Sequence, residues 1–320
     1  MRSEVPAARQ LLDGATQIAV VGHERPDGDS VGSMLALCLS LRERGKQARP
    51  VLAGGLPGRY GFLPGAEEVQ RRMPEGETLV VTVDAADLDR IGFPEVAHVD
   101  INFDHHPSNT RYAAVNLVDP DAPTTTALIY RLAPDLGLPI TPAVAANLLA
   151  GLITDTIGFR TPNVTPETLR LAAALIEAGA NLERAYRKAL VERSFLAVRY
   201  WGQGLSKLEH QGELVWTSLS LADRKSVGYP GPDDADLVEI LTSIQEAQVA
   251  LVFVEQSESQ VKVSWRGRPG VDVARIAAQF KGGGHTLAAG ATIRGTLQSV
   301  MDEVLAATRA AIQPVEQASP

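Results

Sequence analysis

The sequence predicts an α/β protein with a doubly wound, mainly parallel sheet in its N-terminal half. Short apolar runs with the character of strands, 17–23, 78–85 and 98–106, alternate there with segments of helical periodicity. This alternation favours a parallel sheet, because parallel neighbours are usually joined by a helix. Strand-like runs return after a long helical stretch, and 320 residues suffice for two domains. We therefore expect a helical linker followed by a smaller α/β domain.

The predicted helices of the first half have local reasons to start where they do. Pro142 suits the first turn of a helix over 141–156, because that position needs no backbone N–H. Thr165 is a good N-cap for a helix over 165–180. The third helical position after it is Thr168 rather than Glu or Gln, so we expect no capping box there.

Charge-mixed helical sequence follows and connects the two predicted domains. We place the first domain at 1–185, the linker at 186–204 and the second domain at 205–320. Apolar or alternating runs predict three strands of the second domain, at 213–221, 247–256 and 259–267.

Composition limits the classes of function. A net charge of −8 argues against a protein that coats long nucleic acid, so we expect no binding of long duplexes. The single cysteine, Cys38, excludes a disulfide framework and fits a reducing compartment. No run approaches the ~18 apolar residues of a membrane span. We expect a cytoplasmic protein that does not associate with membranes.

Side chains of the metal-binding type gather at the ends of the predicted elements. Three segments follow strands, and the fourth lies near the end of the helix over 141–156. The residues are His23, Asp27 and Asp29 after the first strand, Asp84 at the end of the second, Asp104, His105 and His106 after the third, and Asp155 in the helix.

These segments can meet, because the carboxyl ends of parallel strands share one edge of a sheet, where ligands bind. A single aspartate at a strand end is usually a helix cap or a turn former. Together, however, imidazole nitrogens and carboxylate oxygens suit divalent manganese, iron, cobalt or zinc. The set is too large for one tetrahedral zinc and suffices for two ions that share a carboxylate. Such pairs, ~3.5–4 Å apart, serve displacement reactions at phosphorus.

This ordered set of motifs resembles the DHH/DHHA1 phosphoesterase family over nearly the whole chain. The stretch "VSWRGRPGVDVARIAAQFKGGGHTLAAGA" (263–291) is similar to the DHHA1 substrate-binding domain. The likeness is greatest to the bacterial members that hydrolyse short oligonucleotides and 3′-phosphoadenosine 5′-phosphate (pAp). The resemblance implies two divalent ions, typically Mn²⁺.

The resemblance also implies roles for the individual ligands. One ion is expected on His23, Asp27 and Asp84, and the other on Asp29, Asp84, His105 and Asp155, with Asp84 bridging. Two further catalytic roles follow. Asp104 is expected to support a metal-bound imidazole, that of His105, because such rings need a partner to fix their tautomer. His106 is expected to face the scissile phosphate as a donor or as the acid for the leaving oxygen.

The glycine cluster of the second domain is a candidate anion site. Gly282, Gly283 and Gly284 let the backbone approach an anion, and His285 adds a side-chain donor. The glycines alone favour a flexible turn. Ser264 and Arg266 match the substrate-side motif of the family and shift the interpretation to phosphate binding, for which a guanidinium is well suited.

Two positions depart from the family pattern. Ile157 stands where members often carry glycine, which is expected to reshape the loop after Asp155. Ala127 stands where many relatives carry glutamate, which leaves open how the site is supported from behind.

The resemblance implies hydrolysis of short RNA and DNA to 5′-mononucleotides and of pAp to AMP and phosphate. Linear dinucleotides such as pApA and pGpG are compatible substrates, and a homodimer is compatible with the pattern. One alternative is a single-strand exonuclease of the RecJ type. Another is a linear or cyclic dinucleotide phosphodiesterase. A third, of a different class, is an inactive nucleotide-binding sensor.

Overall fold

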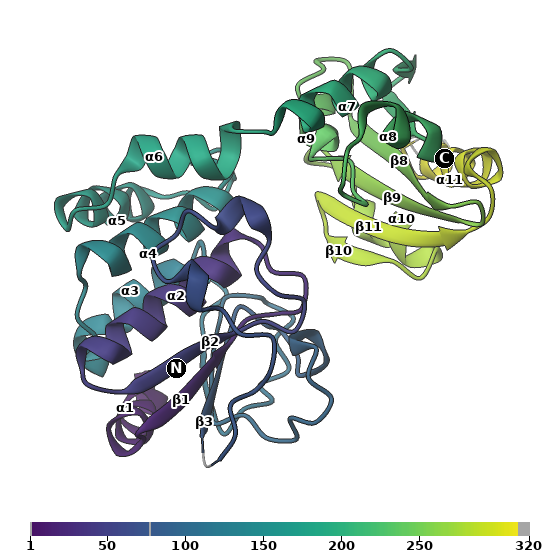
Figure 1. Ribbon diagram of the computed structural model, residues 1–320. Coiled ribbons are helices and arrows are strands. Elements are labelled where there is room, and N and C mark those ends of the chain that lie inside the picture. The colour runs from purple at the N-terminus through teal and green to yellow at the C-terminus, as the bar shows by residue number, and fades with distance from the viewer. Residues whose placement is uncertain (1, 77, 313–320) are drawn as a thin grey trace, which may run out of the picture. The chain divides into compact units, whose positions relative to one another are not determined.

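The computed structural model describes residues 2–76 and 78–312, and the chain divides into two compact units (Figure 1). Unit 1 is Met1–Glu192 and unit 2 is Arg193–Pro320. Each unit has its own sheet and its own buried apolar clusters.

Unit 1 is built on a five-stranded, entirely parallel sheet with the order β2-β1-β3-β4-β5. Its strands are β1 (Gln17–Val21), β2 (Gln47–Val51), β3 (Leu79–Val83), β4 (Ile101–Asp104) and β5 (Val115–Val118). This is a doubly wound order, in which the direction of winding reverses between β1 and β3. The α/β class and the parallel sheet are confirmed. The chain segments that leave β1 and β3 at this switch point carry four of the predicted metal ligands, His23, Asp27, Asp29 and Asp84.

Helices cover one face of this sheet and share a single apolar cluster with it. They are α1 (Val5–Gly14), α2 (Gly28–Glu43), α3 (Thr125–Leu136) and α4 (Pro142–Asp155). Residues that alternate to the other face, including Ala19 and Val21, pack with Ile91 and Phe93 from the segment after β3. The helical face therefore supplies most of the core, and irregular segments close the opposite face.

Helices α2 and α4 pack closely because glycines face each other between them. A Cβ added to Gly32 would lie 2.6 Å from the Asn147 carbonyl oxygen and 3.1 Å from the Gly151 nitrogen. A Cβ at Gly28 would lie 2.2 Å from the Thr154 hydroxyl oxygen. This close approach brings the start of α2 and the end of α4 together, and both ends carry predicted ligands.

Two further α-helices of unit 1 are α5 (Pro166–Glu177) and α6 (Leu182–Tyr186), and a π-helical turn (Arg187–Val191) follows them. The expectation of no capping box on α5 is wrong. The Thr165 hydroxyl accepts from the Thr168 N–H, and the Thr168 hydroxyl accepts from the Thr165 N–H at 3.1 Å. A threonine hydroxyl is thus long enough to complete the reciprocal pair that Glu or Gln usually makes.

Unit 2 is built on a six-stranded mixed sheet with the order β10-β11-β9-β8-β7-β6. Its strands are β6 (Glu209–Gln211), β7 (Leu214–Leu219), β8 (Val249–Ser257), β9 (Gln260–Gly267), β10 (Gly283–His285) and β11 (Ala288–Arg294). Its helices are α7 (Phe195–Leu205), α8 (Leu221–Val227), α9 (Leu237–Leu241), α10 (Val273–Gln279) and α11 (Leu297–Ile312). Only β7 and β8 pair in parallel.

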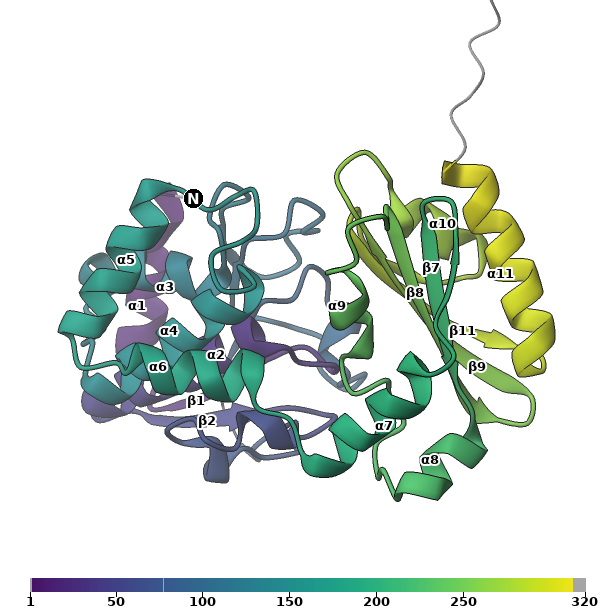
Figure 2. The same ribbon diagram turned by 90° about the horizontal axis from the view of Figure 1, so that it is seen from above.

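The sheet of unit 2 is covered on both faces, and Figure 2 shows α11 along one face with α9 on the other. Strand β8 shows the division, since Leu251 and Phe253 pack with α10 and α11 while Val252 and Val254 pack with α7 and α9. Within the described ranges of the chain, no helix is both long and apolar enough to cross a membrane.

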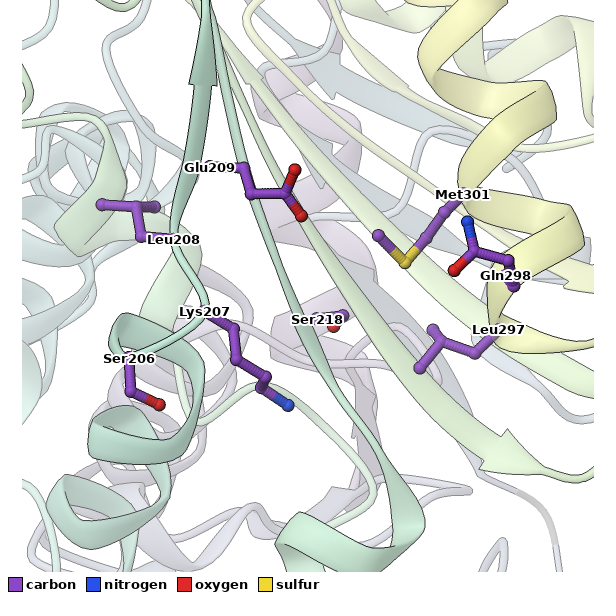
Figure 3. A pocket seen from close by; sticks show the side chains of 8 residues that line it. All are labelled: Ser206, Lys207, Leu208, Glu209, Ser218, Leu297, Gln298 and Met301. Carbon is purple, nitrogen blue, oxygen red and sulfur yellow. The ribbon is translucent and has the colours of Figure 1, made fainter.

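A pocket of about 620 Å³ lies beside the edge strand β6 and the start of α11 (Figure 3). Its lining residues are Ser206, Lys207, Leu208, Glu209, Ser218, Leu297, Gln298 and Met301. The predicted substrate residues of unit 2 lie on or beside β9 and β10, toward the other edge of the sheet. This pocket is therefore distinct from the predicted anion site.

Candidate metal centre

The loop after β1 carries His23 and Asp27 and leads directly into α2, whose first turn carries Asp29. Asp27 is the N-cap of α2, and its Oδ1 accepts from the N–H groups of Asp29 and Ser30 at 3.0 Å. Asp27 thus has the ordinary structural role of an aspartate at a strand end, which is to cap a helix. It does not exclude metal binding, because a carboxylate has about four lone-pair sites. The fold uses Asp27 to start the helix that presents Asp29.

Asp84 follows β3 directly and turns the chain away from the sheet. Its backbone has a φ of 58°, in the left-handed region, and its N–H donates to the Phe103 carbonyl at 2.9 Å. Aspartate tolerates this conformation better than most residues do. The turn directs a buried carboxylate to the switch point of the sheet.

The two histidines that follow β4, His105 and His106, are held by different hydrogen-bonding groups. Nδ1 of His106 lies 2.7 Å from Oδ1 of buried Asp104, and Asn109 donates to Oδ2 of the same carboxylate at 2.6 Å. Nδ1 of His105 instead lies 3.3 Å from the Ala122 carbonyl oxygen. The expectation that Asp104 supports His105 is therefore wrong: Asp104 contacts His106, and a backbone carbonyl orients His105.

The predicted ligands converge on three overlapping groups. Within each group the ligand atoms lie within 4.8 Å of one another. The groups are His23, Asp27 and Asp84; Asp29, His105 and Asp155; and Asp84, His105 and His106.

Asp84 is central to these groups, because its two oxygens face different sides. Its Oδ2 lies 3.7 Å from Nε2 of His23, whereas its Oδ1 lies 3.7 Å from Nε2 of His105. Nε2 of His105 is also 3.6 Å from Oδ2 of Asp155 and 3.9 Å from Oδ2 of Asp29. The arrangement matches a carboxylate shared between two ligand groups.

The buried carboxylates of this cluster repel one another, so their ionised forms are unfavourable without bound cations. Burial, followed by repulsion from Asp29 and other carboxylates, raises the pKa of Asp84 well above its usual range. Burial, followed by repulsion from Asp29, raises the pKa of Asp155 to about 7. The pKa of Asp29 is also raised, mainly by burial. Buried carboxylates at such distances are stable as anions when they are paired with cations or coordinate metals.

The donor set therefore fits divalent ions. It contains carboxylate oxygens and imidazole nitrogens, and two ligand atoms ~2.1 Å from one ion lie roughly 3 Å apart at a right angle. The observed separations of 3.6–3.9 Å between His105 and its three carboxylate neighbours need only small side-chain movements to reach that value.

The start of α3, which was not among the residues predicted from the sequence, is also part of this site. The N–H groups of Thr125 and Thr126 donate to the Asp29 carboxylate at 2.6 and 2.9 Å. The Thr125 hydroxyl donates to Oδ1 of Asp84 at 3.0 Å. The run "TTT" resembles a helix N-cap, which was the available signal. Support from behind the site thus comes from the threonines at the start of α3.

The loop after Asp155 has an unusual backbone. Ile157, Gly158 and Phe159 all have positive φ, at 49°, 68° and 66°. The buried Thr156 holds this turn, because its hydroxyl accepts from the Phe159 N–H at 3.1 Å and donates to the Leu152 carbonyl at 2.6 Å. A β-branched residue rarely adopts this conformation. Ile157 thus occupies a backbone geometry that usually suits glycine.

The predicted substrate residues of unit 2 lie in register across three strands. Gly290 of β11 pairs with Gly283 on one side and Ser264 on the other. Ala288 likewise pairs with His285 and with Arg266. The side chain of His285 lies outside the described part of the structure. The register therefore places the two motifs side by side in one sheet, in rows that are two residues apart.

The glycines of this cluster serve different purposes. A Cβ at Gly282 would lie 2.4 Å from the Gly290 carbonyl oxygen, and one at Gly284 would lie 2.3 Å from the Ala288 carbonyl oxygen. Strand packing alone therefore requires glycine at both positions. A Cβ at Gly283 would have no neighbour within 4 Å. Gly283 is the position whose backbone a ligand can approach.

Arg266 is held by protein groups. Its Nε donates to Oε1 of Glu239 at 2.6 Å and its Nη1 donates to the Trp265 carbonyl at 2.9 Å. Arg268 donates to the backbone carbonyls of Gln245 and Ile244, in the segment after α9, which is a structural role.

Comparison with known proteins places these features in a family. A model of the DHH family, N-terminal domain, matches residues 17–152, and a model of the DHHA1 domain matches residues 230–313. The bifunctional oligoribonuclease and PAP phosphatase NrnA of Thermus thermophilus is 37% identical over 94% of this chain and 91% of its own length. The protein of the same name from Bacillus subtilis is 29% identical over 92% of this chain and 93% of its own length.

Solved structures agree on the fold. An exopolyphosphatase-related protein from Bacteroides fragilis has a TM-score of 0.86 and 22% identity, and the match covers 97% of this chain and 96% of that protein. RecJ from Thermus thermophilus in complex with Mn²⁺ has a TM-score of 0.54 and 16% identity, over 96% of this chain and 54% of that protein. From both domain matches and the extent of the 37% identity, the chain belongs to the DHH/DHHA1 phosphoesterase family.

Proposed function

We propose that this chain is a two-metal phosphoesterase that hydrolyses short oligonucleotides to 5′-mononucleotides and pAp to AMP and phosphate. The observation that carries the proposal is Asp84, whose two carboxylate oxygens face different groups of nitrogen and oxygen ligands. The name of the NrnA relatives, bifunctional oligoribonuclease and PAP phosphatase, points to the same substrates.

In this proposal the ligands divide into two sets, and the mixture of carboxylates and imidazoles suits Mn²⁺. Divalent ions bound there would supply positive charge to the phosphate oxygens and to the attacking water. One set is His23, Asp27 and Asp84, and the other is Asp29, Asp84, His105 and Asp155.

His106 is proposed as the acid for the leaving oxygen. Burial alone would raise the pKa of Asp104, but hydrogen bonds from His106 and Asn109 outweigh burial and hold it below its usual range. In this proposal an ionised Asp104 accepts from Nδ1 of His106 and fixes the orientation of the ring. Nε2 is then the nitrogen that donates a proton to the leaving group.

One mode of binding accounts for both substrates. In pAp and in a 5′-phosphorylated dinucleotide, the bond that breaks joins phosphorus to the O3′ of a nucleoside that carries a 5′-phosphate. Water attacks phosphorus, and O3′ leaves with a proton. Ser264, Arg266 and the amide of Gly283 are proposed to bind the 5′-phosphate, since a guanidinium and backbone amides are suited to that anion.

A substrate panel with added Mn²⁺ tests the proposal. The panel contains pAp, pApA, pGpG, cyclic di-AMP, pyrophosphate, and short and long RNA and DNA with and without a 5′-phosphate. We expect turnover of pAp and of short 5′-phosphorylated chains. Equal rates without the 5′-phosphate contradict the proposed binding mode. Degradation of long single-stranded DNA alone indicates a RecJ-type enzyme, and nucleotide binding without turnover indicates a sensor.

His105→Ala tests the metal assignment within the same assay. We expect turnover of pAp to fall by more than about a hundredfold, because changes behind a metal ligand alone cost about ten- to a hundredfold. The bound Mn²⁺ per chain, measured by elemental analysis, should also fall. His210→Ala is the matched control, since His210 is exposed on β6 in unit 2. An active His105→Ala protein with full metal content excludes this assignment.

A further inference from the structure

The first turn of α3 contacts two of the proposed ligands at once. Asp29 accepts from the backbone of Thr125 and Thr126, so both of its carboxylate oxygens are engaged by this helix. The Thr125 hydroxyl donates to Asp84 at 3.0 Å. Thr125 is thus the residue that touches a ligand of one ion and the carboxylate proposed to bridge both.

We propose that Thr125 is a positioning residue of the metal centre, whose N–H and hydroxyl together set the orientation of Asp29 and Asp84. The inference rests on the proposed function, because it needs those carboxylates to hold ions. It goes beyond that function by assigning a role to a residue that is not itself a ligand.

The backbone part of this role follows from helix geometry. The first N–H groups of a helix have no partner within the helix and carry partial positive charge. Thr124, the N-cap, accepts from the Ala127 N–H at 2.9 Å. The N–H groups of Thr125 and Thr126, which lie between these two residues in the sequence, donate to the Asp29 carboxylate. The carboxylate is therefore fixed by two hydrogen bonds and by the helix dipole.

The hydroxyl part of the role concerns Asp84. Thr125 is fully buried, and its donor occupies one lone pair of Oδ1, the oxygen that also faces His105. Oδ2 remains directed at His23. A donor at this place lowers the repulsion between Asp84 and Asp29, and it fixes which lone pairs point toward the two ligand groups.

The hydroxyl groups of the neighbouring threonines, Thr124 and Thr126, have other partners, so the proposed positioning role is specific to Thr125. The Thr126 hydroxyl pairs with the Thr124 hydroxyl at 2.7 Å, and the Thr126 methyl faces Gly151 of α4. In the described part of the chain, neither of these two hydroxyls forms a hydrogen bond with a proposed metal ligand. Removing the Thr125 hydroxyl is therefore the substitution that separates positioning from packing.

The test compares Thr125→Val, which keeps the shape and removes the hydroxyl, with Thr125→Ser, which keeps the hydroxyl. Mn²⁺ affinity of the full chain is measured by titration calorimetry and by the paramagnetic resonance of free Mn²⁺. We expect Thr125→Val to bind Mn²⁺ about ten- to a hundredfold more weakly, the usual effect of removing a group behind a ligand. Thr125→Ser should remain within a few fold of the wild type.

Thr168→Val is the control for loss of a buried threonine hydroxyl, since Thr168 lies in α5 and its hydroxyl bonds to Thr165, three residues away, among the described residues. It should lower the melting temperature without changing Mn²⁺ affinity. If Thr125→Val does not fold, Thr125→Ala replaces it and must show the same loss.

Three outcomes overturn the inference. Full Mn²⁺ affinity in folded Thr125→Val shows that the hydroxyl does not position Asp84, and leaves the proposed function intact. An equal loss in Thr125→Ser, which keeps the hydroxyl, shows that any change of this side chain weakens binding, and assigns the effect to packing rather than to the hydroxyl. A wild-type protein without Mn²⁺ affinity refutes the proposed function together with this inference, so the two failures are distinguishable.

Discussion

At the scale of single residues, Glu239 controls the charge available at Arg266. Its Oε1 holds Nε of the guanidinium at 2.6 Å, and Arg266 is partly exposed. The carboxylate therefore orients the proposed phosphate-binding group and also competes with the phosphate for its charge. These two effects have opposite signs and can be separated by substitution.

Glu239→Gln should lower the KM for pAp up to about fivefold and leave kcat unchanged, because an exposed ion pair contributes about 1 kcal/mol at most. The amide oxygen still accepts from Nε, so the guanidinium keeps its orientation while the negative charge is removed. Glu239→Ala should raise KM instead. Steady-state kinetics measure both, and Glu246→Gln, an exposed glutamate of the same unit, is the control. A higher KM in Glu239→Gln contradicts the competition.

The sequence could predict which ligands gather, but not which neighbour supports each histidine. Asp104 and His106 are two residues apart at the end of β4, and residues at that spacing share one face of a strand. This spacing was the signal for the contact between them. The support of Asp29 by residues 125 and 126 crosses more than ninety positions of the chain, as the separations of 96 and 97 show. Local patterns carry no information about such a contact.

At the scale of elements, the pairing of α2 with α4 places Asp29 and Asp155. Gly32 lies at their contact, and a Cβ there would meet a backbone oxygen that cannot move aside. The positions of both carboxylates therefore depend on a residue without a side chain.

Gly32→Ala should lower the free energy of unfolding by about 1–3 kcal/mol, the cost of overpacking. It should also weaken Mn²⁺ binding, because α2 and α4 must separate. Chemical denaturation and metal titration measure the two effects. Gly14→Ala is the control, since a Cβ at Gly14 at the end of α1 would meet nothing within 4 Å. Unchanged Mn²⁺ affinity in folded Gly32→Ala would show that the helix contact does not set the ligand positions.

The central elements were predictable because their sequences are strongly patterned, whereas the edge strands were not. β2 contains Pro50, which argues against a strand by propensity but is tolerated at a sheet edge. β5, at the other edge, spans only Val115–Val118, too few residues to show a period. Both strands form because the neighbouring strand offers unpaired backbone groups, a tertiary effect.

At the scale of the whole molecule, the proposed roles divide between the two units. The proposed metal ligands all lie in unit 1, and the proposed phosphate-binding residues all lie in unit 2. Each unit has its own apolar core. Unit 1 alone should therefore catalyse hydrolysis, and the preference for substrates with a 5′-phosphate should require unit 2.

Residues 1–192 expressed alone should fold and bind Mn²⁺ with nearly the affinity of the full chain. They should hydrolyse a small generic phosphodiester, bis-p-nitrophenyl phosphate, without the preference for a 5′-phosphate. Competition by AMP measures that preference, because AMP should inhibit the full chain and not the fragment. Inhibition of the fragment by AMP would place the 5′-phosphate site in unit 1.

The left-handed backbone at Asp84 also limits how this position can change over evolution. Most side chains cost about 1–2 kcal/mol in that conformation, whereas glycine and asparagine are tolerated. Glutamate would keep the negative charge but does not tolerate the left-handed backbone conformation, so it is a poor replacement for Asp84. The replacements that preserve folding are those that abolish the carboxylate. When selection on turnover is relaxed, a lineage can therefore lose the proposed bridging carboxylate in one step. It would still retain its fold and any capacity to bind nucleotides.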